Sequence, residues 1–293
     1  MPGFLFHNQH DLFMPDNIHP MPILAFTADY SDSASRLERA AKASHGLEFS
    51  PDPLRPDLLS GSVLPFLRRD IPVRFHTRYF GWEMGHADRH EAEKALQVHL
   101  ETIKKMHGLG EPVVTVHTGL GPAVPIRESH IRDNLSKLVE FAGKKGITVC
   151  LENLRLGHGS DPYKILEWAK ASGAMITMDT GHARGCSMVR DNLITPADMV
   201  DLFGSSLYEV HVYGREDHLG HHPIKDIAPL QEMLTRLLQT DCKWWTIELQ
   251  DLHLATSSRS ILERFLGRNV TGTSLDYAPG KPAEQDPEHY ERL

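Results

Sequence analysis

Several features that mark other classes of protein are scarce or missing in this chain of 293 residues. No apolar run approaches the roughly 18 residues that a membrane-spanning helix needs. The N-terminal stretch MPGFLFHNQHDLFMPD lacks the basic start and apolar run of a secretory signal. The three cysteines, Cys150, Cys186 and Cys242, are far apart and form no CxxC pair, which argues against a disulfide framework and fits a reduced compartment. We therefore expect a cytoplasmic protein without a membrane partner.

Positive charge is also scarce, because the formal net charge is −8 and no cluster of Lys and Arg stands out. Proteins that bind nucleic acids usually present a basic face, since phosphate contacts dominate their affinity. The composition disfavours DNA or RNA as a partner, although a local basic groove would be compatible with an acidic total. Histidine, in contrast, is abundant, with 19 residues, many of them in loops or at the ends of apolar segments.

The chain alternates eight short apolar segments with stretches of helical spacing. The apolar segments begin at Ile23, Gly46, Val73, Val113, Ile147, Met175, Tyr208 and Trp244. The spacing of apolar residues predicts helices over 91–106, 131–142 and 230–238, and shorter ones over 35–44, 163–171, 196–203 and 258–266. Ser160-Asp161-Pro162 and Thr195-Pro196 are typical helix starts, with a capping side chain followed by proline.

Repeated βα units with continuously apolar strands predict a parallel sheet covered by helices. Eight such units favour closure into a barrel, and no GxGxxG turn follows the first strand, which counts against an open nucleotide-binding sheet. We therefore predict an α/β fold, a single-domain (β/α)8 TIM barrel over residues 23–270. An N-terminal extension over 1–22 and a polar C-terminal tail over 271–293 would flank it.

Six consecutive apolar segments end in residues that can bind a metal: His76, His117, Glu152, Asp179, His211 and Glu248. All strands of a βα barrel open at their C-terminal ends on one face, so residues far apart in sequence meet there. The last four of these residues form a mostly hard ligand set suited to Mn, Mg, Co or Zn. His76 and His117 could be further ligands, or they could be hydrogen-bonded or substrate-contacting histidines.

Three more residues are candidates for the same cavity. His182 follows Asp179 by three residues in DTGH, a spacing that allows both side chains to face one site. Glu216 and His218 lie in the loop GREDHLGHHPI after the seventh apolar segment and could reach the site from there. A solvated loop is the alternative interpretation of these two residues.

Three motifs, LENLRLGHGS from Leu151, MDTGHARG from Met178 and EVHVYG from Glu209, resemble the xylose-isomerase-like superfamily of TIM barrels. This superfamily includes sugar isomerases and epimerases as well as the endonuclease IV-like enzymes (AP endonuclease family 2). The resemblance covers most of the chain, from about Ile23 to about Leu266. In the isomerase and epimerase branch it implies one divalent ion, an acid–base pair and a substrate-contacting histidine at His182.

The ligands that this branch implies are Glu152, Asp179, His211 and Glu248, with the two glutamates as the acid–base pair. The nuclease branch implies three zinc ions, of which the first would be bound by His76, His117 and Glu152. The second would be bound by the four residues already named, and the third by His182, Glu216 and His218. The loop after His211 is shorter than in the nucleases, and Glu216-Asp217-His218 replaces an Asp-x-His pattern.

The first functional hypothesis is a divalent-metal-dependent isomerase or epimerase, or a related lyase, acting on a sugar or sugar phosphate. Proton transfer by Glu152 and Glu248 through a metal-stabilised enediolate would need one ion. Substrate oxygens would be held by His182, Arg184 and Arg215, and the apolar face of the sugar would be covered by Trp82 and Tyr79.

The second hypothesis is an endonuclease IV-like zinc phosphodiesterase that acts on abasic DNA with two or three ions. The third is a non-catalytic barrel that binds a metal or a sugar. The sequence leaves open whether the chain forms a homo-oligomer.

Overall fold

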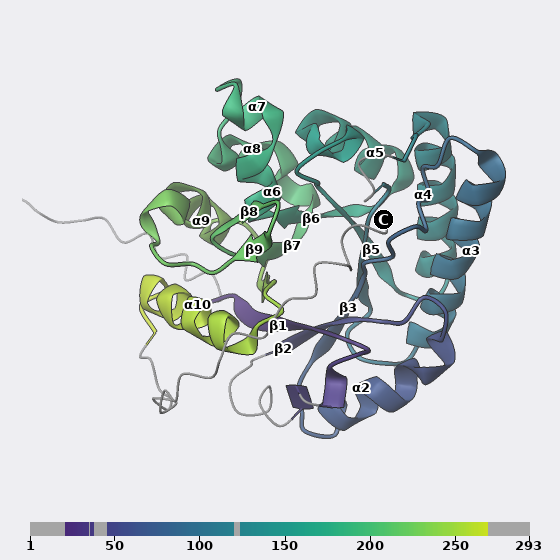
Figure 1. Cartoon of the computed structure of the whole chain (residues 1–293), viewed down its shortest axis with the longest axis horizontal. Coiled ribbons are helices and arrows are strands. Elements are labelled where there is room, and N and C mark those ends of the chain that lie inside the picture. The colour runs from purple at the N-terminus through teal and green to yellow at the C-terminus, as the bar shows by residue number, and fades with distance from the viewer. Residues whose placement is uncertain (1–20, 35, 38–45, 120–123, 269–293) are drawn as a thin grey trace, which may run out of the picture.

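The protein is a closed barrel of eight parallel strands with helices around it (Figure 1), as the sequence predicts. The computed structural model describes residues 21–34, 36–37, 46–119 and 124–268. The order around the barrel is β1-β10-β7-β6-β5-β4-β3-β2. The barrel strands are β1 Ile23–Asp29, β2 Gly46–Ser50, β3 Val73–Thr77, β4 Val113–Val116, β5 Thr148–Glu152, β6 Met175–Asp179, β7 Leu207–Val212 and β10 Trp244–Ile247.

Polar side chains make contacts across the interior of the barrel. Successive side chains of a strand point to opposite faces, so one set faces the helices and the other faces the barrel axis. The hydroxyls of Thr115 on β4 and Thr177 on β6 form a hydrogen bond of 2.7 Å. The hydroxyl of Thr246 on β10 donates to the carboxylate of Glu209 on β7 at 3.1 Å. The apolar residues next to these polar ones along the strands, such as Val114 and Val210, belong to the hydrophobic core. The residues at the C-terminal ends of the strands lie at one open end of the barrel, which we call the mouth.

The predicted helices that lie within the described residues are present. They are α3 Arg89–Met106, α4 Glu128–Gly143, α5 Pro162–Ser172, α8 Pro196–Phe203, α9 Gln231–Leu238 and α10 Leu252–Phe265. Helix α8 has the predicted bounds, and the ends of the others are shifted. Helix α10 begins six residues before the predicted start because Asp251 caps it, accepting hydrogen bonds from two backbone N–H groups. The caps predicted at Asp161 and Thr195 are confirmed, the latter as a capping box.

Other elements were not predicted. Helix α2 Leu59–Leu67 contains Pro65, and the short helices α6 Thr180–Gly185 and α7 Ser187–Arg190 follow β6. Single 3₁₀ turns occur at Pro56–Leu58, His158–Ser160, Gly204–Ser206 and Ala228–Leu230. An antiparallel hairpin of β8 Arg215–Asp217 and β9 Gly220–His222 fills the segment predicted as a loop.

Some predictions fall largely outside the described residues: the N-terminal extension, most of the helix over 35–44, and the tail from 271. Among the helices that are described, none is both long enough and apolar enough to cross a membrane.

Candidate metal centre

The structure brings the six strand-end residues together at one mouth of the barrel. His76, His117, Glu152, Asp179, His211 and Glu248 are each at most 5% exposed. They come from β3, β4, β5, β6, β7 and β10, or from the position directly after the strand. Burying so many carboxylates in one place is costly unless cations or hydrogen bonds compensate the charge.

The central group is formed by Glu152, Asp179, His211 and Glu248, whose ligand atoms all lie within 4.8 Å of one another. The Nδ1 atom of His211 is 3.3 Å from an oxygen of Glu152 and 3.3 Å from an oxygen of Glu248. Each of the four residues also has one buried atom that forms no hydrogen bond within the described part of the chain: Glu152 Oε2, Asp179 Oδ2, His211 Nδ1 and Glu248 Oε2. Four converging unsatisfied atoms, three of them carboxylate oxygens and one an imidazole nitrogen, fit a divalent cation.

Asp179 is held so that one of its oxygens stays free. Its Oδ1 accepts hydrogen bonds from the backbone N–H of His182 at 2.6 Å and from the phenol of Tyr213 at 2.8 Å. The side chain of Asn153 bonds to both the N–H and the carbonyl of Asp179. Burial raises the pKa of Asp179 to about 6, although nearby His182 opposes the rise. An ion bound at the free oxygen would therefore compete with a proton at mildly acidic pH.

A second group shares Glu152 with the first. The Nε2 atoms of His76 and His117 lie 3.1 and 2.9 Å from Glu152 Oε2, and 3.4 Å from each other. Two atoms bound to one zinc ion at about 2.0–2.2 Å in tetrahedral geometry lie about 3.3 Å apart. The 3.4 Å between the two histidine nitrogens therefore fits a shared ion, whereas the 2.9 and 3.1 Å to Glu152 Oε2 are hydrogen-bond lengths.

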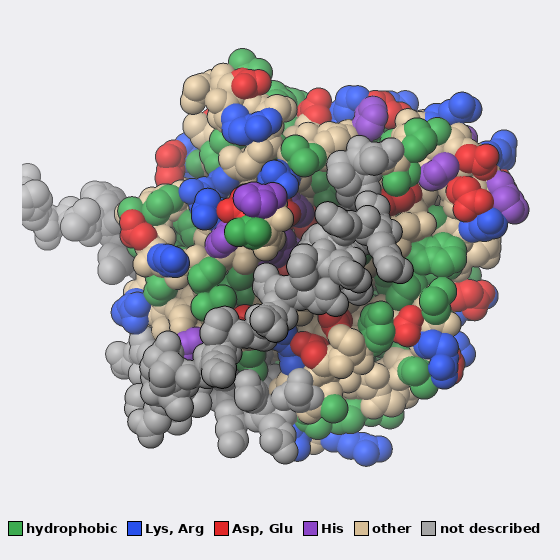
Figure 2. Space-filling view, viewed as in Figure 1, with side chains coloured by type: hydrophobic (Ala, Val, Ile, Leu, Met, Phe, Trp, Pro, Cys, Tyr) green, Lys and Arg blue, Asp and Glu red, His purple; other side chains and the backbone are tan. Residues whose placement is uncertain are grey.

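The third group consists of His182, Glu216 and His221. Glu216 Oε2 lies 3.4 Å from His182 Nε2, and Glu216 Oε1 lies 3.9 Å from His221 Nε2. Arg155, which the sequence analysis did not identify, already pairs with Glu216 at 2.6 Å. The predicted His218 is exposed at the turn of the β8–β9 hairpin and belongs to none of the groups; His221 from β9 lies at the site instead. Histidine and charged side chains gather over this hairpin in Figure 2.

The two candidate acid–base residues are held in the ionised form. Burial alone would raise the pKa of Glu152, but the charges of His211 and His117 hold it well below its usual range. Burial acts on Glu248 in the same direction, and the charges of His211 and His221 again prevail and lower its pKa. Both carboxylates can therefore accept a proton at neutral pH.

The residues predicted to hold the substrate are mostly turned to other partners. The hydroxyl of Tyr79 bonds to Thr102 on α3 at 2.9 Å and the residue is 2% exposed, so its ring does not line the mouth. Trp82 is half-buried and packs against the hydrophobic core. Arg184 donates to the carbonyl of Gly214, and Arg215 is exposed and pairs with Asp217.

Arg78, in contrast, reaches the site without having been predicted. It follows His76 by two residues and lies 3.7 Å from Glu248 Oε1 and 3.7 Å from Asp29. Its Nε donates to Ser50 at 3.0 Å. The dipeptide Thr77-Arg78 directly after the strand-end histidine was the signal that could have identified it.

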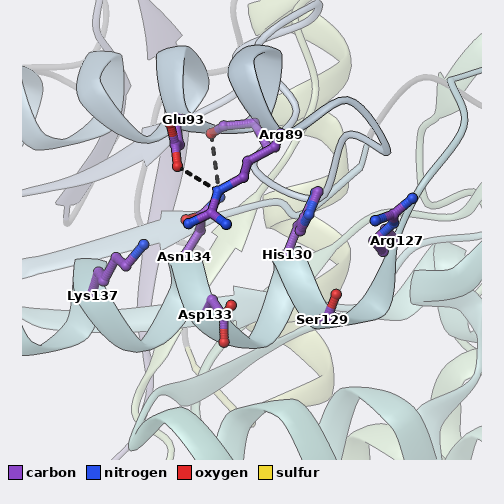
Figure 3. Close-up of a pocket in the computed structure, with 9 residues that line it drawn as sticks. Arg89, Glu93, Arg127, Ser129, His130, Asp133, Asn134 and Lys137 are labelled. Carbon is purple, nitrogen blue, oxygen red and sulfur yellow. Dashed lines mark hydrogen bonds and ion pairs between the residues drawn. The ribbon is translucent and has the colours of Figure 1, made fainter.

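A cavity of about 260 Å³ lies away from this centre, between the starts of α3 and α4 (Figure 3). Arg89 and Glu93 form an ion pair at its edge, and Arg127, His130 and Lys137 also line it. None of the groups suited to a metal includes a residue of this cavity, within the ranges that the structure describes.

Comparison with known proteins agrees with this architecture. The family model described as Xylose isomerase-like TIM barrel matches residues 64–265. The Uncharacterized protein MJ0008 of Methanocaldococcus jannaschii is 32% identical over 179 residues, which are 61% of this chain and 76% of that protein.

Two solved structures share the fold. A D-tagatose 3-epimerase-like protein is 22% identical with a TM-score of 0.65, covering 84% of this chain and 97% of that one. Endonuclease IV from Thermus thermophilus is 16% identical with a TM-score of 0.63, covering 84% and 99%. Similar folds thus occur in an epimerase-like protein and in a nuclease.

Proposed function

Because the chain belongs to the xylose isomerase-like TIM barrel family, we propose that it is a divalent-metal-dependent isomerase or epimerase acting on a sugar or sugar phosphate. One observation carries the proposal: the buried glutamates Glu152 and Glu248 approach the same His211 nitrogen, each at 3.3 Å. They come from β5 and β10, with β6 and β7 between them in the barrel. An isomerase moves a proton between two carbons of the substrate, and an epimerase moves it between the two faces of one carbon. Two carboxylates on different sides of one centre can remove and return that proton.

A divalent ion bound by Glu152, Asp179, His211 and Glu248 would act as a Lewis acid on the carbonyl and hydroxyl oxygens of the substrate. Glu152 or Glu248 takes the proton from the carbon next to the carbonyl, and the other glutamate returns a proton. A bound cation would keep both carboxylates ionised, which is the form that a base requires. Mn, Mg, Co and Zn are all compatible with the donor set.

The substrate oxygens would be held by residues at the mouth. His182 directs its Nε2 toward Glu216 at 3.4 Å, beside the central group. Arg78 and Arg155 are each partly exposed, and both lie within 4 Å of a glutamate of the site. They replace Arg184 and Arg215 as our candidates for binding hydroxyl or phosphate oxygens, because an arginine offers several donors in a fixed fork.

Solvent isotope exchange tests the reaction independently of the product. The protein is incubated in D₂O with each metal and with a panel of ketoses and ketose phosphates. Mass spectrometry and proton NMR then detect deuterium at the carbon next to the carbonyl. We expect exchange with the wild type, none with Glu152→Gln or Glu248→Gln, and unchanged exchange with Glu140→Gln, whose side chain is 69% exposed on α4.

The proposal is wrong if no combination of metal and substrate gives exchange. It is also wrong if exchange persists in both glutamine variants of the site.

A second candidate function is a zinc phosphodiesterase of the endonuclease IV kind. The group of His76, His117 and Glu152 supports it, because that group provides a second ion position that proton transfer does not require. Elemental analysis giving two or three zinc ions per chain would favour it, whereas one ion favours the isomerase. Incision of an oligonucleotide with an abasic site, abolished in Glu248→Gln, would establish it. A non-catalytic barrel would show neither exchange nor incision.

A further inference from the structure

Glu48 is the only charged residue in the apolar segment GLEFS, and it was not among the predicted site residues. It lies on β2, is fully buried and points into the barrel between two histidines. Its Oε1 is 2.9 Å from His211 Nε2, and its Oε2 is 3.6 Å from His76 Nδ1. His211 belongs to the central group and His76 to the second group, and the two also form a further candidate group with Glu48 itself. One carboxylate therefore lies behind both groups.

The two rings present opposite nitrogens to the mouth. His211 directs Nδ1 toward Glu152 and Nε2 toward Glu48. His76 directs Nε2 toward Glu152 at 3.1 Å, and its Nδ1 lies 3.6 Å from Glu48 and 3.7 Å from Glu248. A neutral imidazole carries its proton on one nitrogen and can bind a metal only through the other. The partner of the rear nitrogen therefore decides whether the front nitrogen is available.

We propose that Glu48 is a positioning residue for both rings. Its Oε1 accepts the N–H of His211 Nε2 and fixes that tautomer, and its Oε2, which forms no hydrogen bond within the described residues and lies 3.6 Å from His76 Nδ1, would accept the N–H of His76 after a small approach. His211 is then set to bind an ion through Nδ1 and His76 through Nε2. A hydrogen bond from the rear nitrogen of a ligand histidine to a carboxylate also orients the ring and increases its basicity. The inference rests on the metal centre proposed above but not on the reaction.

Glu48 could alternatively be a ligand itself, since its oxygen and nitrogens of His76 and His211 lie within 4.8 Å of one another. An ion there, together with ions in the central and second groups, would require both histidines to give up both ring protons and bridge two ions each. The contact of 2.9 Å between Glu48 and His211 is a hydrogen-bond length and needs no such bridging.

Glu48 is itself held from the side away from the mouth. Glu209 on β7 lies next to it and pairs with Arg74 at 3.4 Å; burial and the charge of Glu48 raise the pKa of Glu209 to about 8, so Glu209 can carry the proton that two adjoining carboxylates share. Thr246 donates to the other oxygen of Glu209 at 3.1 Å. Arg74 lies over the ring of Trp244 at 4.4 Å. This packing leaves the Glu48 carboxylate little freedom to turn away from the histidines.

The variant Glu48→Gln keeps the shape of the side chain but replaces one oxygen by an NH₂ group. The amide can accept from one histidine, while its NH₂ must donate to the other ring and force that ring into the wrong tautomer. We expect metal affinity, measured by chelator competition and elemental analysis of the full chain, to fall about 10- to 100-fold. Glu263→Gln is the control, because Glu263 is a buried glutamate on α10 whose ion pair is with Arg259 rather than with a histidine or with Glu48. It should bind metal as the wild type does.

A measurement on the zinc-loaded wild type keeps the test decisive even if Glu48→Gln does not fold. Two-dimensional NMR of ¹⁵N-labelled histidines should show His211 protonated at Nε2 and His76 at Nδ1. The inference is overturned if His211 binds zinc through Nε2, if either ring has lost both protons, or if folded Glu48→Gln binds zinc like the control. These measurements use no sugar, so a negative isotope-exchange result would leave them unaffected.

Discussion

The phenol of Tyr213 offers a sharp test of how the centre is held, because removing one oxygen atom changes a single contact to a ligand. Tyr213 is fully buried directly after β7, and its hydroxyl donates to Asp179 Oδ1 at 2.8 Å. Its ring stacks on His221 with centroids 4.0 Å apart and planes 9° apart. Tyr213→Phe keeps this ring and removes only the hydrogen bond.

The structure sets the size of the expected effect. A hydrogen bond to a charged group contributes about 1.5–3 kcal/mol, and 1.4 kcal/mol corresponds to about tenfold in an equilibrium constant. Ion binding requires the ionised form of Asp179, which this bond stabilises, so most of the loss should fall on metal binding. We expect the dissociation constant of the metal to rise about 10- to 150-fold.

Chelator competition at pH 7.5 measures the metal affinity, and thermal melts in excess EDTA measure the fold without metal. Tyr208→Phe is the matched control, because Tyr208 lies on the same strand with its ring against Arg74. An affinity of Tyr213→Phe within twofold of the wild type would refute the reasoning. An equal loss of melting temperature with and without metal would show instead that the hydroxyl supports the fold.

The remaining predictions concern packing, pH and capping. A Cβ added at Gly181 would lie 2.2–2.6 Å from the ring and hydroxyl of Tyr213. Gly181→Ala should therefore lower stability by about 1–3 kcal/mol and weaken metal binding. Gly143→Ala, whose Cβ meets nothing within 4 Å, should be neutral or slightly stabilising in urea unfolding. The charges of Asp179 and Glu216 raise the pKa of His182 from 6.5 to about 10, although burial lowers it. The stability that protonated His182 contributes is therefore complete below pH 6.5 and is lost as the pH rises toward 10. The melting temperature of the metal-free protein should fall over this pH range, and it should fall less in His182→Gln. Removing the capping box of α8 by Thr195→Ala should cost about 1 kcal/mol in the same urea assay and leave the metal affinity unchanged.

The barrel could be predicted because its strands are short apolar runs whose C-terminal residues are chemically distinctive. Each of the eight apolar runs is a strand of the barrel. The residues at the ends of four of these runs, Glu152, Asp179, His211 and Glu248, lie together in the structure. The site residues were predicted only from the C-terminal ends of the strands and from the segments that follow them. Glu48 lies in the middle of its run, where the reasoning expects burial without chemistry, and so it was missed.

Residues beyond the strand ends were harder to predict because local pairing decides where they point. His221 and His218 are separated by the turn of a hairpin, and the antiparallel register that pairs Glu216 with His221 brings the later histidine inward. Tyr79 follows a strand end but turns to Thr102, because a buried hydroxyl needs a partner. Sequence spacing alone does not encode these choices.

The membership of Glu152 in two groups has a consequence for how the protein would fill with metal. A carboxylate shared by two neighbouring positions cannot give its full negative charge to both, and two close cations repel each other. The first ion to arrive would change the affinity for the second, so a titration should not show two equal, independent steps. Samples purified with little metal would then hold a mixture of loading states, and their average content should be measured again after saturation.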